Sequence, residues 1–301
     1  MSAGLGELAA IGTAVSWGIS NQVQSVVARM MGSTGVTLLR MPYQIAFLAF
    51  LCFIMQADIS FSSQNFLLLI VSGVLGICCC DYALYRSITI IGPAMAVLLL
   101  SMSAGFTALF GWIFLSEIMP FQAVAGIVTT LLGIGWVVTE HSASTLLPGQ
   151  EVPEGKVLLL GVALAASAAV CLAASFIFLK LAMQNSVDPL WASFVRLCGG
   201  AAVLWAVGLV RGWIPAVGSG LRRYPRIYWM LFFSCGCGSL GMWFSSLAMN
   251  MAPVGIAATL IGLQPIMVTI IGALWYRRAP SLRTVSGIVI AFCGTALVCL
   301  R

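Results

Sequence analysis

An aspartate lies inside one of the most apolar stretches of the chain, in the sequence CCCDYALYRS at residues 78–87. A carboxylate buried without a partner is costly, so Asp81 must be paired, protonated or in contact with water. Tyr85 shares its face on a helix, because the two are four positions apart. Arg86 misses this spacing, whereas Arg40 lies at a similar depth in its own apolar stretch. Two interpretations follow: a structural ion pair between Asp81 and Arg40, or a site where Asp81 binds a proton or a cation.

Other polar side chains recur at helical spacing and form a candidate binding surface. Trp17, Asn21 and Gln24 stand at positions i, i+4 and i+7 and share one helix face. Gln264 stands next to Pro265, which should kink its helix. Hydrogen bonds between helices account for these residues as well as contact with a bound molecule does.

Four aromatic residues form a second candidate feature. Trp17, Tyr82, Tyr85 and Trp243 could surround an ammonium group as an aromatic cage. Aromatic residues in such proteins also serve as packing groups or as anchors at the membrane surface. Both interpretations stay open.

The composition indicates the solvent in which these residues must work. Of the 301 residues, 61% are hydrophobic and 7% are charged, and the mean hydropathy is +1.08. Soluble domains have about a quarter of their residues charged. Lipid must therefore surround most of the chain, and helices satisfy the backbone groups of long apolar runs there. We expect an all-α membrane protein that contacts a lipid bilayer.

Apolar runs of roughly 20 residues predict ten transmembrane helices. The predicted spans are 5–28, 36–56, 65–86, 93–115, 121–140, 157–180, 189–210, 227–249, 253–275 and 284–300. A segment rich in Pro, Gly and Ser divides them. The predicted organisation is a five-helix repeat at 1–140, a connecting loop at 141–156 and a second five-helix repeat at 157–301.

The two halves repeat each other. Pro93 matches Pro253, and Pro120 matches Pro280, both at an offset of 160. Because five spans is an odd number, the second half must enter the membrane in the opposite direction. The sequence therefore predicts two inverted-topology repeats, with a substrate site near the midplane between them.

Arg196 is the counterpart of Arg40 in this repeat, whereas Gly241 stands where the first half has its aspartate. Arg196 thus lacks the corresponding acid. It could pair with Glu117 or Asp188, bond to backbone carbonyls, or hold a substrate carboxylate in its planar fork.

The motifs resemble those of one known family. These are SWG in the first span, an arginine in the second, GPAMA…LSE through the fourth and a late G(x6)G. Together they resemble the EamA branch of the drug/metabolite transporter superfamily over nearly the whole chain. The resemblance implies a secondary transporter, in a family where many members export amino acids and related metabolites. Glu117 matches the family's acid between spans four and five, but Arg277 and Arg278 depart from that acid in the second half.

Little in the sequence supports an enzyme, a metal site or a cofactor. His141 is the only histidine and lies in the connecting loop. The ten cysteines lie in apolar runs without the spacing of a zinc site. The segment GQEVPEGKV lacks the spacing of a phosphate-binding loop, and its Val157 replaces the required Ser or Thr. The net charge of +6 is spread over loops, which argues against a nucleic-acid partner.

The positive charges predict an orientation. Apart from Arg40 and Arg196, which lie within spans, the odd-numbered connections and the span ends beside them contain ten basic residues, Arg29, Arg86, Lys156, Arg211, Arg222, Arg223, Arg226, Arg277, Arg278 and Arg283. The other side has only Lys180 and Arg301. Basic loops stay in the cytoplasm, so both termini should face outward. The resembled family usually has both termini inside, in a bacterial-type inner membrane.

We therefore expect a secondary active transporter of a small organic metabolite that works by alternating access. Asp81 would couple transport to protons, while Arg196 and the aromatic residues would set substrate charge and shape. Export is favoured by the resemblance alone. An importer of a quaternary amine such as choline and a lipid flippase or scramblase remain as alternatives, and the chain could be a monomer or a homodimer.

Overall fold

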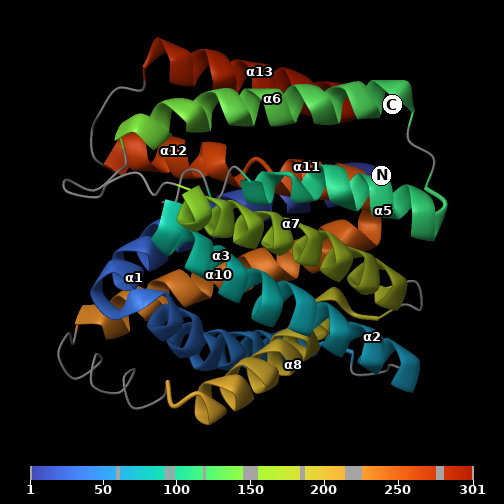
Figure 1. The fold of residues 1–301 in the computed structure, drawn as a ribbon. Helices are drawn as coiled ribbons and strands as arrows, with labels where there is room; N and C mark the ends of the chain where they lie inside the picture. Colours follow the sequence, from blue (N-terminus) through green and yellow to red (C-terminus); the bar gives the residue numbers. More distant parts are fainter. Residues whose placement is uncertain are drawn as a thin grey trace.

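The computed structural model describes residues 2–58, 62–91, 96, 99–117, 120–144, 155–183, 187–213, 226–275 and 281–299, and within them the regular structure is helical throughout. The elements are α1 (Ser2–Met55), α2 (Ser63–Gly73), the π-helix η1 (Val74–Cys79), α3 (Cys80–Ile91), α5 (Ser103–Leu115), α6 (Phe121–Ser144), α7 (Gly155–Met183), α8 (Pro189–Val210), α10 (Arg226–Met251), α11 (Val254–Ile261), α12 (Gln264–Trp275) and α13 (Leu282–Cys299). Figure 1 shows α6 and α13 side by side at one end of the molecule, with α8 and part of α1 at the other.

The lengths and surfaces of these helices suit a bilayer. Five helical stretches are long and apolar enough to cross it: Thr34–Met55, Ser63–Ile91, Gly155–Met183, Pro189–Val210 and Arg226–Met251. Four shorter apolar helices are Leu99–Leu115, Phe121–Trp136, Val254–Met267 and Val285–Gly294. Large apolar side chains such as Phe53, Phe121 and Trp229 are more than three-quarters exposed, as lipid-facing residues would be. The prediction of an all-helical membrane protein is confirmed, and helices occupy the predicted spans.

The first two predicted spans form one continuous element, α1, which bends at Gly32. Its φ of 78° is the kind of conformation that glycine adopts most readily. Arg40 Nη1 donates a hydrogen bond to Gln24 Oε1 at 3.3 Å, although the two are 16 residues apart. In a straight helix they would be about 24 Å apart. The chain therefore turns back at Gly32, and the two parts of α1 face each other.

The third span is continuous but changes helix type in its middle. It consists of α2, η1 and α3, and π-helical turns of this kind are rare and often lie at functional sites. Glycines bring α8 unusually close to this segment. A Cβ on Gly73 would collide with the backbone oxygen of Arg196, and one on Gly200 would lie 2.6 Å from the backbone oxygen of Gly73.

The fourth and ninth spans are both interrupted, at equivalent positions. A turn at Met102 precedes α5, and a turn at Gly262 separates α11 from α12. Met102 and Gly262 are separated by 160 positions, the same offset that relates the paired prolines of the two halves. The interruption in the ninth span falls just before Pro265, which confirms the predicted kink. A Cβ on Gly262 would lie 3.8 Å from Ala104, so the two interruptions face each other, as discontinuous helices of transporters often do.

The contact between α6 and α13 shows the inverted arrangement directly. A Cβ on Gly133 would lie 2.5 Å from the backbone nitrogen of Ala291, and one on Gly294 would collide with the backbone of Thr130. Small residues at these places let the two backbones approach. Early residues of one helix meet late residues of the other, so α6 and α13 are antiparallel. They are the fifth and tenth spans, whose antiparallel course is what inverted repeats require.

Two reciprocal serine pairs join the repeats. Ser20 on α1 donates to the backbone oxygen of Ser234 on α10 at 2.9 Å, and Ser234 donates back to Ser20 at 3.1 Å. Ser72 on α2 and Ser175 on α7 exchange the same two bonds at 2.7 Å each. The first pair joins spans one and eight, and the second joins spans six and three. Because these spans are equivalent in the repeat, the second pair is the copy of the first.

Candidate functional site

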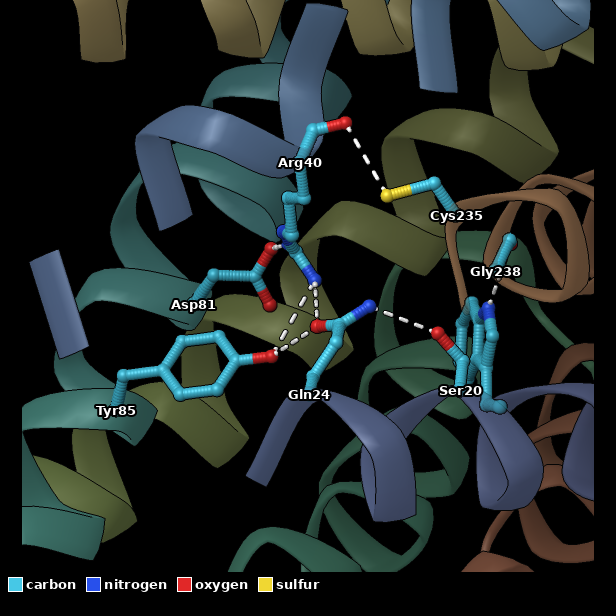
Figure 2. A network of polar contacts seen from close by, with 8 residues as sticks. Ser20, Gln24, Arg40, Asp81, Tyr85, Cys235 and Gly238 are labelled. Atoms are coloured by element: carbon cyan, nitrogen blue, oxygen red, sulfur yellow. Dashed lines mark hydrogen bonds and ion pairs between the residues drawn. The ribbon is translucent and has the colours of Figure 1, made fainter. Parts of the chain in front are cut away.

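Arg40 and Asp81 form an ion pair (Figure 2). Arg40 comes from the second part of α1, and Asp81 lies in the first turn of α3, immediately after η1. Their side chains are 10% and 18% exposed. Because the two charges cancel, this arrangement is much cheaper within a membrane than either charge alone.

Gln24 and Tyr85 complete the surroundings of the Arg40 guanidinium. The Tyr85 hydroxyl donates to Gln24 Oε1 at 2.6 Å. Arg40 Nη1 donates to the same oxygen at 3.3 Å and to the Tyr85 hydroxyl at 3.5 Å. The guanidinium carbon also lies 5.6 Å from the centre of the Tyr85 ring, within cation–π range. Arg40 therefore has a carboxylate, an amide and a phenol as partners.

The same network reaches the second repeat. Gln24 Nε2 donates to Ser20 Oγ at 2.8 Å, and Ser20 is paired with Ser234 on α10. Cys235, the next residue on α10, donates its thiol to the backbone oxygen of Arg40 at 3.6 Å. A continuous set of polar contacts thus links the ion pair to the contact between α1 and α10, as Figure 2 shows.

Arg196 is equally buried but has far fewer partners. Its side chain lies in α8 and the residue is 4% exposed. Nη2 donates to Ser175 Oγ at 3.2 Å, and Nε, like that of Arg40, has no partner among the described residues. Within that same part of the chain, no carboxylate lies within ion-pairing distance of the guanidinium.

The two acids named as possible partners of Arg196 accept hydrogen bonds elsewhere, so the described contacts do not support that alternative. Asp188 Oδ1 accepts from the backbone nitrogens of Leu190 and Trp191, at 2.7 and 3.1 Å, and caps the start of α8. Glu117 Oε2 accepts from the backbone nitrogen that begins α11, at 2.9 Å. Free amides at helix starts attract such acceptors. Asp188 is also about 12 Å from Arg196 along the helix axis.

Both halves of the chain match the model of one protein family, described as the EamA-like transporter family, over residues 4–139 and 159–300. The chain belongs to this family. Among solved structures, one whose title reads only "Crystal structure of protein" has a TM-score of 0.72 and 15% identity, covering 99% of this chain and 96% of that chain. At that identity the likeness shows the fold alone. No curated protein sequence matches the chain.

Membership of the EamA-like transporter family confirms three predictions made from sequence. The chain is a multi-pass membrane transporter of the drug/metabolite transporter superfamily, it is not an enzyme, and it contains two copies of one unit. The Arg40 and Arg196 sites lie in those two copies. Their comparison is therefore a comparison of equivalent places in one transporter.

The aromatic residues of the predicted cage have separate partners in this transporter. Trp17 donates to the Gly238 backbone oxygen at 3.3 Å, Tyr82 stacks on Trp213 at 5.7 Å between ring centres, and Trp243 stacks on Phe244 at 5.6 Å. Tyr85 faces Arg40, which already supplies a cation to its ring. These contacts give the aromatic-cage interpretation no support.

Asn21 and Gln264 lie outside the ion-pair network. Asn21 is half-buried on α1, and its side chain makes no hydrogen bond to any described residue. Gln264 is 8% exposed and is the first residue of α12, directly after the interruption at Gly262. Polar groups at an interrupted helix are suitably placed to face a substrate cavity.

Within the described ranges, no cluster of three or more metal-ligating side chains occurs, and the cysteines are free thiols. His141 and residues 149–154 of the phosphate-loop-like segment lie outside the side chains that the structure describes, and the rest of that segment is the exposed start of α7. Arg277 and Arg278 also lie outside the described side chains.

The serine pairs change the register of the repeat around Asp81. Asp81 is nine residues after Ser72, and the ninth residue after the equivalent Ser234 is Trp243. Trp243 therefore takes the place that sequence matching had given to Gly241. The second copy has no acid in either register. The serines themselves were not predicted, because a buried serine on an apolar helix looks in sequence like any small packing residue.

Proposed function

We propose that this chain is a secondary active transporter of small organic metabolites, amino acids or related compounds, and that Asp81 couples transport to protons. One observation carries the proposal. The buried Arg40–Asp81 pair is hydrogen-bonded, through Gln24 and Ser20, to the contact between α1 and α10. A change of charge at Asp81 therefore acts on an interface between the two repeats.

The coupling follows from the partners of Arg40. When Asp81 is ionised, it neutralises the guanidinium and holds α3 against α1. When it is protonated, the ion pair is lost and Gln24 and Tyr85 are left as the partners of a bare cation. The two protonation states thus favour different packings of α1, α3 and α10. Such a bias between two conformations is what alternating access requires.

The other predicted binding residues belong to this proposal. Trp17, Asn21, Tyr82, Trp243 and Gln264 come from spans one, three, eight and nine, and each is buried or half-buried. Their proposed role is to contact the substrate. The proposal also includes the predicted division of the chain into a first repeat that ends at residue 140 and a second that begins at residue 157. Energy would come from an ion or substrate gradient, and export rests on the family resemblance.

A thermal-shift assay on the purified full-length protein tests the coupling role. The protein is screened against amino acids, other carboxylates, quaternary amines and nucleosides at about pH 6 and about pH 8. We expect a ligand response in the wild type that depends on pH and that loses this dependence in Asp81→Asn. Asp58→Asn is the matched control, because Asp58 is an exposed acid just beyond α1.

The result that would refute the coupling role is also specific. If Asp81→Asn is less stable but keeps both its ligand response and the pH dependence of that response, Asp81 is only the structural partner of Arg40. A response to choline-like amines alone would favour the importer, and stimulation by lipid alone would favour a flippase.

The orientation has a separate test. From the distribution of basic residues we expect both termini outside the cytoplasm. A reporter fused after Arg301, which lies outside the described residues, should then be active on the periplasmic side. A cytoplasmic signal would show that the family habit prevails over the charge distribution.

A further inference from the structure

Arg196 is a buried cation without a counter-charge in the part of the chain that the structure describes. Its guanidinium has one hydrogen bond, to Ser175 Oγ at 3.2 Å, and its Nε, like the Nε of Arg40, has no partner among these residues. The residue is 4% exposed. A charged group in this situation carries a large free-energy penalty unless something else neutralises it.

The repeat shows what is missing. The backbone around the two arginines is packed alike: Cys235 contacts the backbone oxygen of Arg40, and its equivalent Gly73 lies against the backbone oxygen of Arg196. Ser20, which bonds Gln24 near Arg40, corresponds to Ser175, which bonds Arg196 itself. The two arginines therefore have the same backbone packing and equivalent serine pairs.

The polar partners are not copied. Counted from the equivalent serines, three apolar residues, Trp243, Leu247 and Leu179, replace Asp81, Tyr85 and Gln24. None of the three can accept a hydrogen bond from a guanidinium or balance its charge. The second copy therefore keeps the arginine and lacks the carboxylate, the phenol and the amide that surround it in the first copy.

We propose that Arg196 binds the carboxylate of the transported molecule, which takes the place that Asp81 occupies beside Arg40. The inference rests on the proposed transport function and names its substrate class. A planar guanidinium matches a carboxylate in a two-pronged contact. The cargo is then a carboxylate-bearing metabolite, zwitterionic or anionic, and a quaternary amine without a carboxylate is excluded.

The place of Arg196 also links binding to Asp81. A Cβ on Gly76, in η1, would lie 3.6 Å from Arg196 Nη2, so the π-helix covers the guanidinium in this conformation. Asp81 follows the end of η1 by two residues. When Asp81 is protonated, its ion pair with Arg40 breaks, and η1 moves together with Asp81 and uncovers Arg196. Protonation in the first repeat thus opens the carboxylate site in the second.

Ligand binding to the purified full-length protein tests this inference directly. The probes are amino acids and short aliphatic carboxylates, each compared with its methyl ester, together with choline and inorganic phosphate. We expect the wild type to bind carboxylates and not their esters. Arg196→Gln should weaken carboxylate binding on the order of ten- to a hundredfold, and Arg196→Lys should weaken it less.

A second variant keeps the test decisive if Arg196→Gln does not fold. Trp243→Asp places a carboxylate at the position equivalent to Asp81. We expect it to neutralise Arg196 internally and to abolish carboxylate binding. Trp243→Asn removes the same indole without adding a charge: any weakening that it shares with Trp243→Asp is due to loss of the indole, and only the further loss in Trp243→Asp counts as neutralisation of Arg196.

Several outcomes would overturn the inference: equal binding of acids and esters, unchanged affinity in Arg196→Gln, carboxylate binding that survives in Trp243→Asp, or tighter binding of phosphate than of any carboxylate. A wild type that binds no carboxylate overturns it too. The proposed function fails separately, when Asp81→Asn keeps the pH dependence, so the two failures are distinguishable.

Discussion

The two buried arginines of this transporter lie in matching frames and have opposite electrostatic surroundings. Arg40 is paired with Asp81 and bonded to Gln24 and Tyr85. Among the described residues, the Arg196 guanidinium has a single hydrogen-bond partner, Ser175. The repeat has thus preserved the packing of backbones and changed the side chains that carry charge. The two copies therefore differ at the charged side chains, and these are the places where we propose that the proton and the substrate bind.

The contacts that the two repeats share are those that set the distances between helix backbones. Reciprocal serine pairs fix spans one and eight, and again spans three and six. Small residues at Gly133 and Gly294 bring α6 and α13 together. Such contacts depend on size and on local hydrogen bonds, so they work equally well in either half. Charge pairs do not share this tolerance, because one lost partner leaves the other unpaired.

The largest expected difference between the copies is in stability. Arg40→Gln leaves Asp81 as a partly buried carboxylate without a cation, and it should lower the free energy of unfolding by about 3 kcal/mol. Arg196→Gln removes a buried charge that has no counter-charge among the described residues, so it should raise the free energy of unfolding of the ligand-free protein and not lower it. Denaturant titration of the ligand-free protein in detergent, near neutral pH, measures both.

The double variant sharpens this comparison. Arg40→Gln combined with Asp81→Asn removes both charges, and it should recover most of the stability lost in Arg40→Gln alone. If Arg196→Gln proves as damaging as Arg40→Gln, Arg196 has a structural partner and the contrast between the copies disappears. If the double variant recovers nothing, the ion pair is not what makes Arg40 important.

The sequence predicted the helices well, because apolar length and periodicity are local properties. It also predicted the kink at Pro265, since proline removes a backbone hydrogen bond wherever it stands in a helix. The equivalent interruption at Met102 has no proline. It lies against the ninth span at Ala104 and Gly262, and a contact between distant segments is not visible in either segment alone.

The candidate site was harder to predict for the same reason. The pairing of Arg40 with Asp81 was expected from depth, but the bend at Gly32 that brings Gln24 to Arg40 was not. The π-helix before Asp81 was also unforeseen. The role of Asp188 could have been found, because an aspartate followed by Pro189 is a typical helix start. The register that places Trp243 opposite Asp81 needed the serine contacts, since apolar helices align equally well when shifted by two residues.

The smallest expected effects come from the serines, and they test the comparison most finely. Ser20→Ala and Ser175→Ala are equivalent changes, each removing one reciprocal bond between the repeats, and each should lower stability by about 1 kcal/mol. Their functional effects should differ. Ser20 supports Gln24 beside the ion pair, so its loss should alter the pH dependence of ligand binding; Ser175 supports Arg196, so its loss should weaken carboxylate binding at every pH. Unequal stability losses would argue against the equivalence of the serine pairs. If Ser20→Ala and Ser175→Ala have the same effect on ligand binding, the two arginines belong to one site. Two equivalent substitutions can give different phenotypes only if the arginines have separate tasks.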